Sequence, residues 1–524
     1  METIEKSLFV KSRIMILMFG AAVAFLQALP ATSMAAGADT LLQRAVILAC
    51  FFVGAALFVR DHLSGKLTTG KALGYMLFGG MLLRVYYVLF YDILTLQNDT
   101  GTYTGFGTDG INIGHLGYIE YIYKFFKLPD MDPYEVFGYF HPPVHHIIEA
   151  LWLTVQRLIG VQEALAFENL QVPTLIYSGL CMLVMLHILL ECGAEGKRLL
   201  LGMLLFCFQP RMMILAGSVN NDILALLLLL TTIWRTLAWI RDKSYKNTVL
   251  LALSLGFAMI TKLNTAICAL TVAFVFVICL RSALRSKNLV LIRDTLIKEA
   301  VFTVICAPIG LSFILRNLIV YGKKPGLPTQ GTGSVMYMGN YAPWEIVGIP
   351  MPWDLRIDFP FHPISAEACH NGWVILFQTA MFAEGYPADL GEALRAMAGI
   401  AYVAAIIVAV VSSVVFIASC AGKVFGRSER SQEERLSFGF LLATFVLMLV
   451  SFVLYLLKYP YTCSGDFRYM AATLVFVSLG FSWLWPKEGA EDGGRFAGTI
   501  RLLLGMAMAA SLIFAGLVIL CWQI

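Results

Sequence analysis

The segment between residues 96 and 146 carries the residue types that general acid–base chemistry uses. It holds six carboxylates and four of the eight histidines of the chain. Asp109 stands among closely spaced glycines, so the backbone there can turn tightly and come close to a ligand. A carboxylate in such a turn can accept a proton from a hydroxyl group. Asp109 is therefore the candidate general base, and Asp99 is the alternative for the same role.

A second acidic pattern, Asp130-Met131-Asp132, has the spacing of carboxylates that hold a divalent metal ion. It lies between two prolines, where aspartate is also favoured because its side chain hydrogen-bonds the backbone of a turn. The nearby histidines have no carboxylate at ligand spacing, and the 11 cysteines show no zinc pattern. We therefore favour no metal ion and no other cofactor, and keep a divalent metal at Asp130 and Asp132 as the alternative.

The composition of the chain places these residues in a membrane protein. Of 524 residues, 59% are apolar and only 14% are charged, and the mean hydropathy is +0.76. Soluble domains are about 45–50% apolar and about 25% charged, so this class is excluded. The net charge of +4 leaves no electrostatic footprint for nucleic acid. The chain is predicted to be an all-α polytopic protein whose first partner is the lipid bilayer.

Apolar runs long enough to cross a bilayer recur along the chain, since a crossing helix needs about 20 mostly apolar residues. Thirteen runs qualify: 14–36, 43–59, 72–95, 171–191, 199–217, 223–240, 248–260, 264–280, 299–319, 397–419, 437–457, 469–485 and 502–521. The segment 143–160 carries His145, His146, Glu149 and Arg157, too many polar groups for a free-standing span. We expect it to begin at the outer face and to pack on protein, which gives about 13 to 14 transmembrane helices in all.

The charges of the linkers predict the orientation of the chain. Lysine and arginine crowd the short linkers, and basic linkers stay in the cytoplasm. This rule predicts a cytoplasmic amino terminus in the plasma membrane, with sizeable outer loops at 96–141 and 320–394 and a short one at 458–468. Cys369 and Cys463 fall in outer loops, where we expect them to approach within disulfide range.

Three motifs follow one another on the predicted outer side. The first joins Asp109, a short interfacial helix and Tyr139-Phe140-His141-Pro142-Pro143; the second is Gln209-Pro210-Arg211 with Asn220-Asn221-Asp222; the third is Phe467-Arg468-Tyr469. Together they resemble membrane glycosyltransferases of the GT-C type, in particular the protein O-mannosyltransferase-like and aminoarabinose-transferase-like group. The resemblance covers about residues 72–485. It leaves two additional helices in 1–71, and a cytoplasmic linker with a last helix in 486–524.

The resemblance implies the activity. Such an enzyme transfers one hexosyl- or pentosyl-type sugar from a polyprenyl-phosphate carrier to a protein, lipid or polysaccharide acceptor on the extracytoplasmic face. A single base opposite the leaving phosphate would invert the anomeric carbon. His141 stands where some members of the group carry a basic residue, and no large soluble domain follows the last motif.

The resemblance also implies roles for particular residues. The leaving phosphate is an anion and needs cations. The outer-side candidates are Arg468, Arg211, Lys458, Lys262 and Arg316, of which the first four are assigned to the donor phosphate. A buried lysine needs a partner, and Asp222 is the expected partner of Lys262. The remaining substrate-site candidates are His115, Tyr118, His141, His145, Asn221 and Asp222.

Other classes of membrane protein remain as alternatives. A secondary transporter would place its polar residues near the bilayer midplane and would show inverted repeats, and no repeat is visible in this sequence. A glycan flippase or polymerase is the further alternative. Catalytic residues gathered on one side of the membrane favour the transferase.

Overall fold

The computed structural model describes residues 2–95, 113–326, 331–385, 387, 390–427, 430–487 and 494–521. Over these ranges the chain is helical, with only isolated bridges and no named strand. Ten helical segments in the described ranges are long and apolar enough to cross a membrane. The protein is therefore an all-α, multi-pass membrane protein, as the composition predicts.

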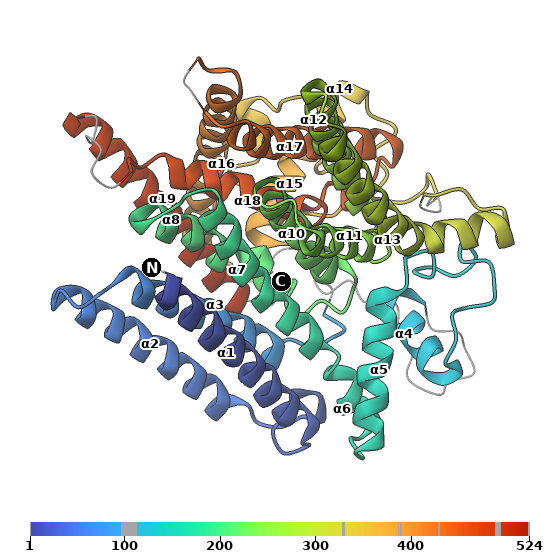
Figure 1. Cartoon of the computed structure of the whole chain (residues 1–524). Helices are drawn as coiled ribbons and strands as arrows, with labels where there is room; N and C mark the ends of the chain where they lie inside the picture. The colour runs from blue at the N-terminus through green and yellow to red at the C-terminus, as the bar shows by residue number, and fades with distance from the viewer. Residues whose placement is uncertain are drawn as a thin grey trace.

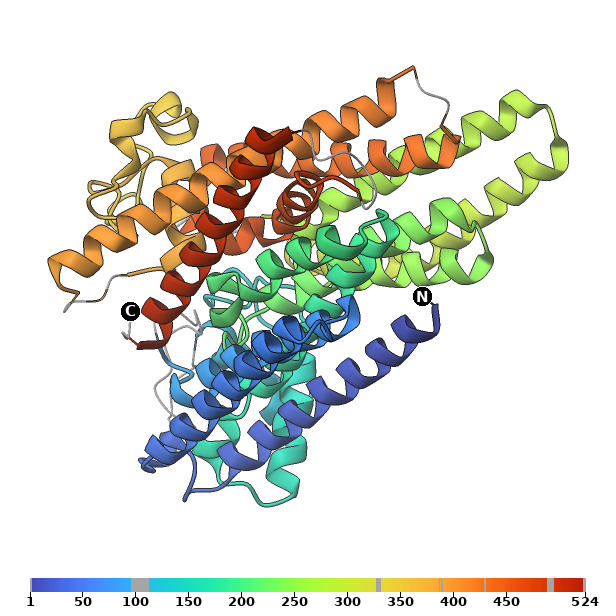
Figure 2. The same cartoon turned by 90° about the vertical axis from the view of Figure 1, so that its left-hand side faces the viewer.

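The ten candidate spans follow the predicted apolar runs. They are α1 (its part Ser7–Ala28), α2 (Leu41–Leu63), α3 (Thr69–Phe90), α6 with α7 (Glu163–Glu191), α10 (Asp222–Arg241), η3 with α12 (Leu263–Ser286), α13 (Leu289–Tyr321), α16 (Glu392–Phe425), α17 (Gln432–Lys458) and α19 (Gly494–Cys521). The first three helices lie side by side along one flank of the molecule (Figure 1). In Figure 2 the segment 331–385, in yellow, gathers at the end of the molecule where α16 begins.

Three predicted spans form helices shorter than 18 residues, so ten of the predicted thirteen to fourteen spans are long helices in the described ranges. These are α8 (Gly196–Phe208), α11 (Tyr245–Met259) and α18 (Leu474–Trp483). Helix α8 ends at Gln209 because Pro210 opens a separate short helix, α9 (Pro210–Ile214). Helix α18 is preceded by the 3-10 helix η6 (Phe467–Thr473), which takes up the first part of the predicted span. Both interruptions fall within the second and third sequence motifs.

The segment 143–160 packs on protein, as expected. It forms α5 (Val144–Leu158), which packs against α4 (Gly114–Phe125) of the first predicted outer loop. His145, His146 and Glu149 on α5 have no exposed surface. Arg157 is partly exposed, and it donates a hydrogen bond to a backbone carbonyl and lies 3.7 Å from the carboxylate of Glu163. The polar face of α5 is thus turned to the protein, although within the described residues both ring nitrogens of His145 and both carboxylate oxygens of Glu149 have no hydrogen-bond partner.

The loops sort to two ends of the molecule. At one end the predicted outer loops touch, because Met338 N donates to Pro460 O at 2.7 Å and the Tyr134 hydroxyl donates to Lys324 O at 2.8 Å. Among the predicted cytoplasmic linkers, Arg198 Nε donates to Trp485 O at 2.8 Å and Lys243 lies 3.5 Å from Glu433. The alternation of linkers read from the sequence fits this arrangement.

Close helix packing depends on one glycine at the crossing of α16 and α18. A Cβ atom added at Gly480 would overlap the backbone carbonyl oxygen of Ser412. The two helices therefore approach so closely that only a hydrogen atom fits between them.

Cys369 and Cys463, which are expected from the sequence to approach within disulfide range, form no disulfide in the structure. Cys369 is buried, whereas Cys463 is partly exposed.

Candidate functional site

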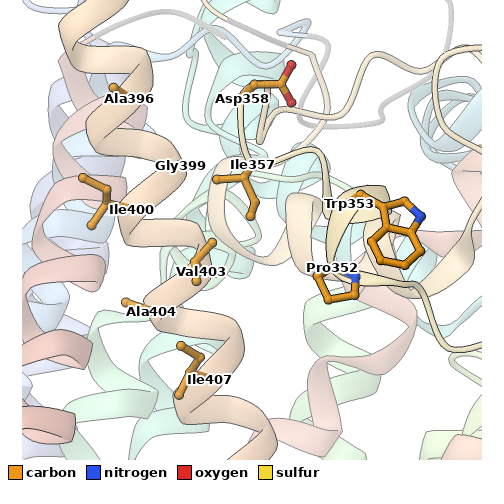
Figure 3. A pocket seen from close by; sticks show the side chains of 10 residues that line it. All are labelled: Pro352, Trp353, Ile357, Asp358, Ala396, Gly399, Ile400, Val403, Ala404 and Ile407. Atoms are coloured by element: carbon orange, nitrogen blue, oxygen red, sulfur yellow. The ribbon is translucent and has the colours of Figure 1, made fainter.

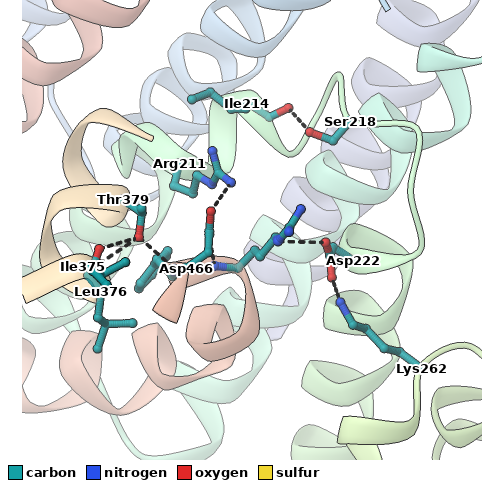
Figure 4. Close-up of polar contacts among 11 residues, drawn as sticks. Arg211, Ile214, Ser218, Asp222, Lys262, Ile375, Leu376, Thr379 and Asp466 are labelled. Atoms are coloured by element: carbon teal, nitrogen blue, oxygen red, sulfur yellow. Dashed lines mark hydrogen bonds and ion pairs between the residues drawn. The ribbon is translucent and has the colours of Figure 1, made fainter. Parts of the chain in front are cut away.

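The break between α8 and α9 fixes a buried arginine. The Gln209 side chain accepts a hydrogen bond from Arg211 N at 2.7 Å and donates one to Ala380 O at 3.0 Å. Arg211 then reaches Asp466, with 2.6 Å between Arg211 Nη2 and Asp466 Oδ2 (Figure 4). These two side chains are 1% and 0% exposed, so the pair is fully withdrawn from solvent. The predicted donor-phosphate residue Arg211 is therefore already engaged by a carboxylate.

Asp466 caps the helix that carries Arg468. Its Oδ1 accepts a hydrogen bond from Arg468 N at 2.7 Å, which starts η6 at the third sequence motif. Thr379 on α15 (Gly372–Phe382) accepts a second bond, from Phe467 N at 2.9 Å. The cap and this bond together set the direction in which the Arg468 side chain leaves the backbone.

A second carboxyl, Glu384, shares a hydrogen bond with Asp466. Burial, with the neighbouring Asp466 charge, raises the pKa of Glu384 to about 8. Burial opposes ionisation of Asp466 as well, but Arg211 and Arg468 hold its pKa below the ordinary value. At neutral pH the pair thus consists of an ionised Asp466 and a protonated Glu384. Ala383, just before Glu384, has a φ of 60° and a ψ of −155°, which a side chain rarely adopts.

Asp222 joins two of the predicted phosphate ligands. It begins α10, where its backbone N–H donates to Asn220 Oδ1 at 3.0 Å. Lys262 forms an ion pair with Asp222 Oδ1, as expected, and Arg468 Nε lies 4.0 Å from Oδ2. Asn221 plays a structural part, since its amide donates to Thr261 O at 2.8 Å. Figure 4 shows the Lys262–Asp222 pair beside the Arg211–Asp466 pair.

A cavity of about 420 Å³ opens beside these cations. Its polar end is formed by Lys262, Lys458, His141 and Asn264. Its walls are largely apolar and come from α10, α12 and α17, with Leu229, Ile267, Met448, Phe452 and Leu454 among them. Leu454 is 60% exposed, so the apolar part reaches the outer surface of α17. The cavity is thus amphipathic, with positive charge at one end.

A stack of aromatic rings connects α4 and α5 to this cavity. His115 Nδ1 lies 2.9 Å from His146 Nε2, and the rings of His115 and His141 stack at 4.7 Å. Tyr118 stacks on His146 at 4.3 Å. His145, one position further, is buried, with its Nδ1 3.8 Å from a carboxylate oxygen of Glu149. Burial, then His115 and Lys262, hold the pKa of His141 well below the ordinary value, so this imidazole is neutral.

Other predicted residues lie elsewhere. Asp109 and Asp99 fall outside the described residues. Asp130 is paired with Lys127 at 2.6 Å, and Asp132 with Lys323 at 2.8 Å. Arg316, a candidate for the phosphate, donates to the carbonyl of Pro129 instead. In the described part of the chain no group of three or more side chains has the arrangement of a metal site.

The structure brings together several residues that lie far apart in the sequence. His115, His141, Asp222, Lys262 and Arg468 surround one centre, through the contacts given above. Sequence reasoning missed Asp466 and Glu384, which complete the charge arrangement. The position of Asp466 directly before Phe467-Arg468-Tyr469 was a usable signal, because aspartate is a preferred helix cap. Glu384 lies in a loop whose fold the sequence does not reveal.

The fold and site thus define a multi-pass, all-α membrane protein with a buried cluster of charge at the end where its long loops meet. No family model matches the chain, and no curated protein matches it. Among solved structures it is similar to the apo oligosaccharyltransferase of Archaeoglobus fulgidus, with 12% identity, a TM-score of 0.49 and coverage of 85% of this chain and 55% of that one.

Two further structures are similar to the chain. One is the A. fulgidus oligosaccharyltransferase AglB with an inhibitory peptide and a dolichol-phosphate (13% identity, TM-score 0.44, 85% of this chain and 55% of that one). The other is ArnT from Cupriavidus metallidurans bound to undecaprenyl phosphate (14% identity, TM-score 0.34, 79% and 78%). The chain spans about half the length of the archaeal structures.

Proposed function

We propose that this chain is an integral-membrane glycosyltransferase that takes a sugar from a polyprenyl-phosphate carrier and delivers it to an acceptor on the extracytoplasmic face. The observation that carries this proposal is the amphipathic cavity of about 420 Å³. Its cationic end suits a phosphate, and its apolar walls, open toward the surface of α17, suit a hydrocarbon chain. A water-soluble anion would leave those apolar walls without a ligand.

In this proposal the cations stabilise the leaving group. The bond between the anomeric carbon and the phosphate oxygen breaks, and the carrier leaves as an anion. Lys262 and Lys458 line the cavity, and Arg468 lies near Lys262 because both approach Asp222, so in this proposal the three cations offset that charge. Arg211 does not contact the phosphate in this proposal. It positions Arg468 indirectly, because it binds Asp466, and Asp466 caps the helix that carries Arg468.

The base remains Asp109 in this proposal. It would accept the hydroxyl proton of the acceptor while the acceptor oxygen bonds to the anomeric carbon, with inversion. Asp109 precedes Gly114, the first residue of α4, by five positions, and α4 carries His115 of the ring stack. Neutral His141 can orient hydroxyl groups by hydrogen bonding without adding charge. In this proposal the shape of the cavity selects the type of sugar that is transferred.

The test compares two carriers that differ only in the phosphate. The full chain in lipid nanodiscs is titrated with undecaprenyl phosphate and with undecaprenol, and the shift of the unfolding temperature is measured. We expect the phosphate to stabilise the protein more, and Arg468→Met to remove the difference. Equal stabilisation by both lipids would overturn the proposal. Lys127→Met, an exposed outer-loop lysine, is the matched control and should change neither titration.

A further inference from the structure

A second cavity, of about 530 Å³, lies between α15, α16, α17, α18 and α19. Its lining is almost wholly apolar: Gln209, Ser413 and Thr473 are its only polar members, and no charged side chain of the described residues lines it. A phosphate in this cavity would find no cation. The cavity therefore suits a neutral hydrocarbon, in contrast to the cationic cavity beside Lys262.

This second cavity opens sideways on the surface of the helix bundle. At its outer end Val410, Val414 and Ile417 of α16 are 49%, 59% and 38% exposed. At its inner end Phe467 and Met470 are only 8% and 5% exposed. Because α16 is a candidate span, its exposed apolar side chains face lipid. An apolar path thus leads from the bilayer into the protein.

The inner end of the path reaches the charged centre. Gln209 lines it and accepts the hydrogen bond from Arg211 N, and Phe467 lines it directly after Asp466 in the chain. Met470, one turn further along η6, lines both cavities. The two cavities therefore flank the same short helix, η6. The cavity beside Lys262 has cations in its lining, and the second cavity has none among the described residues.

The loop at the mouth of this path has the features of a membrane–water interface. Ile349 lines the second cavity and is 92% exposed, and Trp353, four residues further along the chain, is 78% exposed. Figure 3 shows Trp353, Pro352 and Ile357 facing the first turns of α16 across a shallow groove. Exposed tryptophan is enriched at the level of lipid headgroups. The mouth of the second cavity then opens in the leaflet just beneath that level.

We infer that the second cavity holds the hydrocarbon chain of the acceptor, so that the acceptor is itself a membrane lipid with a hydroxyl-bearing headgroup. The inference rests on the proposed function and specifies its acceptor. A peptide or a polysaccharide would bring polar groups into a cavity that offers them almost no partner. The headgroup hydroxyl gives its proton to the carboxylate base, its oxygen bonds to the anomeric carbon, and polyprenyl phosphate leaves.

A photoreactive lipid tests this assignment. The probe is a dodecyl glucoside with a diazirine in its alkyl chain, added to the full chain in nanodiscs and mapped after illumination by mass spectrometry. We expect crosslinks on α15, α16 and η6 at the second cavity, and we expect them to persist in excess undecaprenyl phosphate. Crosslinks that undecaprenyl phosphate displaces would overturn the inference, because both cavities would then serve one carrier.

Two matched substitutions on α16 complete the test. Ala409→Trp fills the second cavity, whereas Ala404→Trp places the same indole in the surface groove of Figure 3. We expect Ala409→Trp to reduce crosslinking at least tenfold with undecaprenyl phosphate binding retained, and Ala404→Trp to leave both unchanged. Equal effects of the two variants would show an unspecific lipid surface and refute the inference. If undecaprenyl phosphate fails to bind the unaltered protein, the donor proposal fails by itself, whatever the crosslinks show.

Discussion

Neutralising Asp222 should have opposite effects on the stability of the protein and on its affinity for a phosphate lipid. In the structure the carboxylate holds Lys262 directly and lies 4.0 Å from Arg468 Nε. Two unit charges at that separation interact by about 4 kcal/mol at an effective dielectric constant of about 20. Loss of one member of a buried ion pair typically costs about 3–5 kcal/mol. Asp222→Asn should therefore lower the unfolding temperature of the ligand-free protein by several degrees.

The same substitution should strengthen binding of undecaprenyl phosphate. Asp222 competes with the phosphate for Lys262 and Arg468 and repels it, so its removal leaves two cations for the ligand. Lys262→Met destabilises the protein for the same reason but removes a phosphate ligand. A charge-assisted hydrogen bond contributes about 1.5–3 kcal/mol, so this variant should bind about ten- to hundredfold more weakly.

The assay measures unfolding temperatures in nanodiscs across a titration of undecaprenyl phosphate, for both variants and for a control pair. Lys127 and Asp130 form an exposed ion pair at 2.6 Å, and solvent screens the attraction in such pairs. Asp130→Asn should therefore change neither stability nor binding to a measurable extent. If Asp222→Asn weakens binding as much as Lys262→Met, then Asp222 positions Lys262 for the ligand and the competition argued here is refuted.

Three further predictions concern other parts of the chain. The carboxyl group of Glu384 has a pKa of about 8 in the folded protein, whereas in the unfolded chain it loses its proton near pH 4.5. The stability that it contributes therefore falls as the pH rises between these two values and is constant above about 8. The unfolding temperature should change less steeply from pH 5 to 9 in Glu384→Gln, and parallel slopes would contradict the assignment. Gly480→Ala should destabilise the protein by about 1–3 kcal/mol or more through overlap with a backbone oxygen of α16, while Gly422→Ala, which has open space around it, should be tolerated in the same thermal measurement. Asp109→Asn should reduce sugar transfer at least about 100-fold with insertion and folding intact. Asp99→Asn is the milder control, and an active Asp109→Asn protein would show that Asp109 is not the base.

Much of the fold could be predicted because lipid imposes a simple rule on sequence. Every long apolar run is helical over much of its length in the described ranges, and the burial of His145 and Glu149 followed from the cost of polar groups in lipid. The lengths of α8 and α18 could not be predicted from hydropathy. Hydropathy does not reveal a helix break at which protein groups hydrogen-bond the free backbone N–H and C=O groups. Pro210 was the local sign of one such break.

The candidate site could be predicted in part. The partnership of Lys262 with Asp222 followed from the cost of an unpaired buried charge, which holds whatever the fold. The link between Asp466 and Glu384 could not be foreseen, since 82 residues separate them and the loop that carries Glu384 has no periodic pattern. The second cavity was also invisible, because its lining is indistinguishable in sequence from ordinary helix core.

The helix break at Gln209 limits which amino acids can replace this residue during evolution. One amide side chain donates to Ala380 O and accepts from Arg211 N, and it is 6% exposed, so water cannot replace either bond. Glutamate would lose the donor, lysine would lose the acceptor, and methionine would lose both. Asparagine keeps both groups on a side chain that is one methylene shorter. Both partners are backbone groups, which substitutions at Ala380, or at Arg211 other than to proline, leave in place. A change at either partner therefore cannot compensate for a change at Gln209, and this position should vary little.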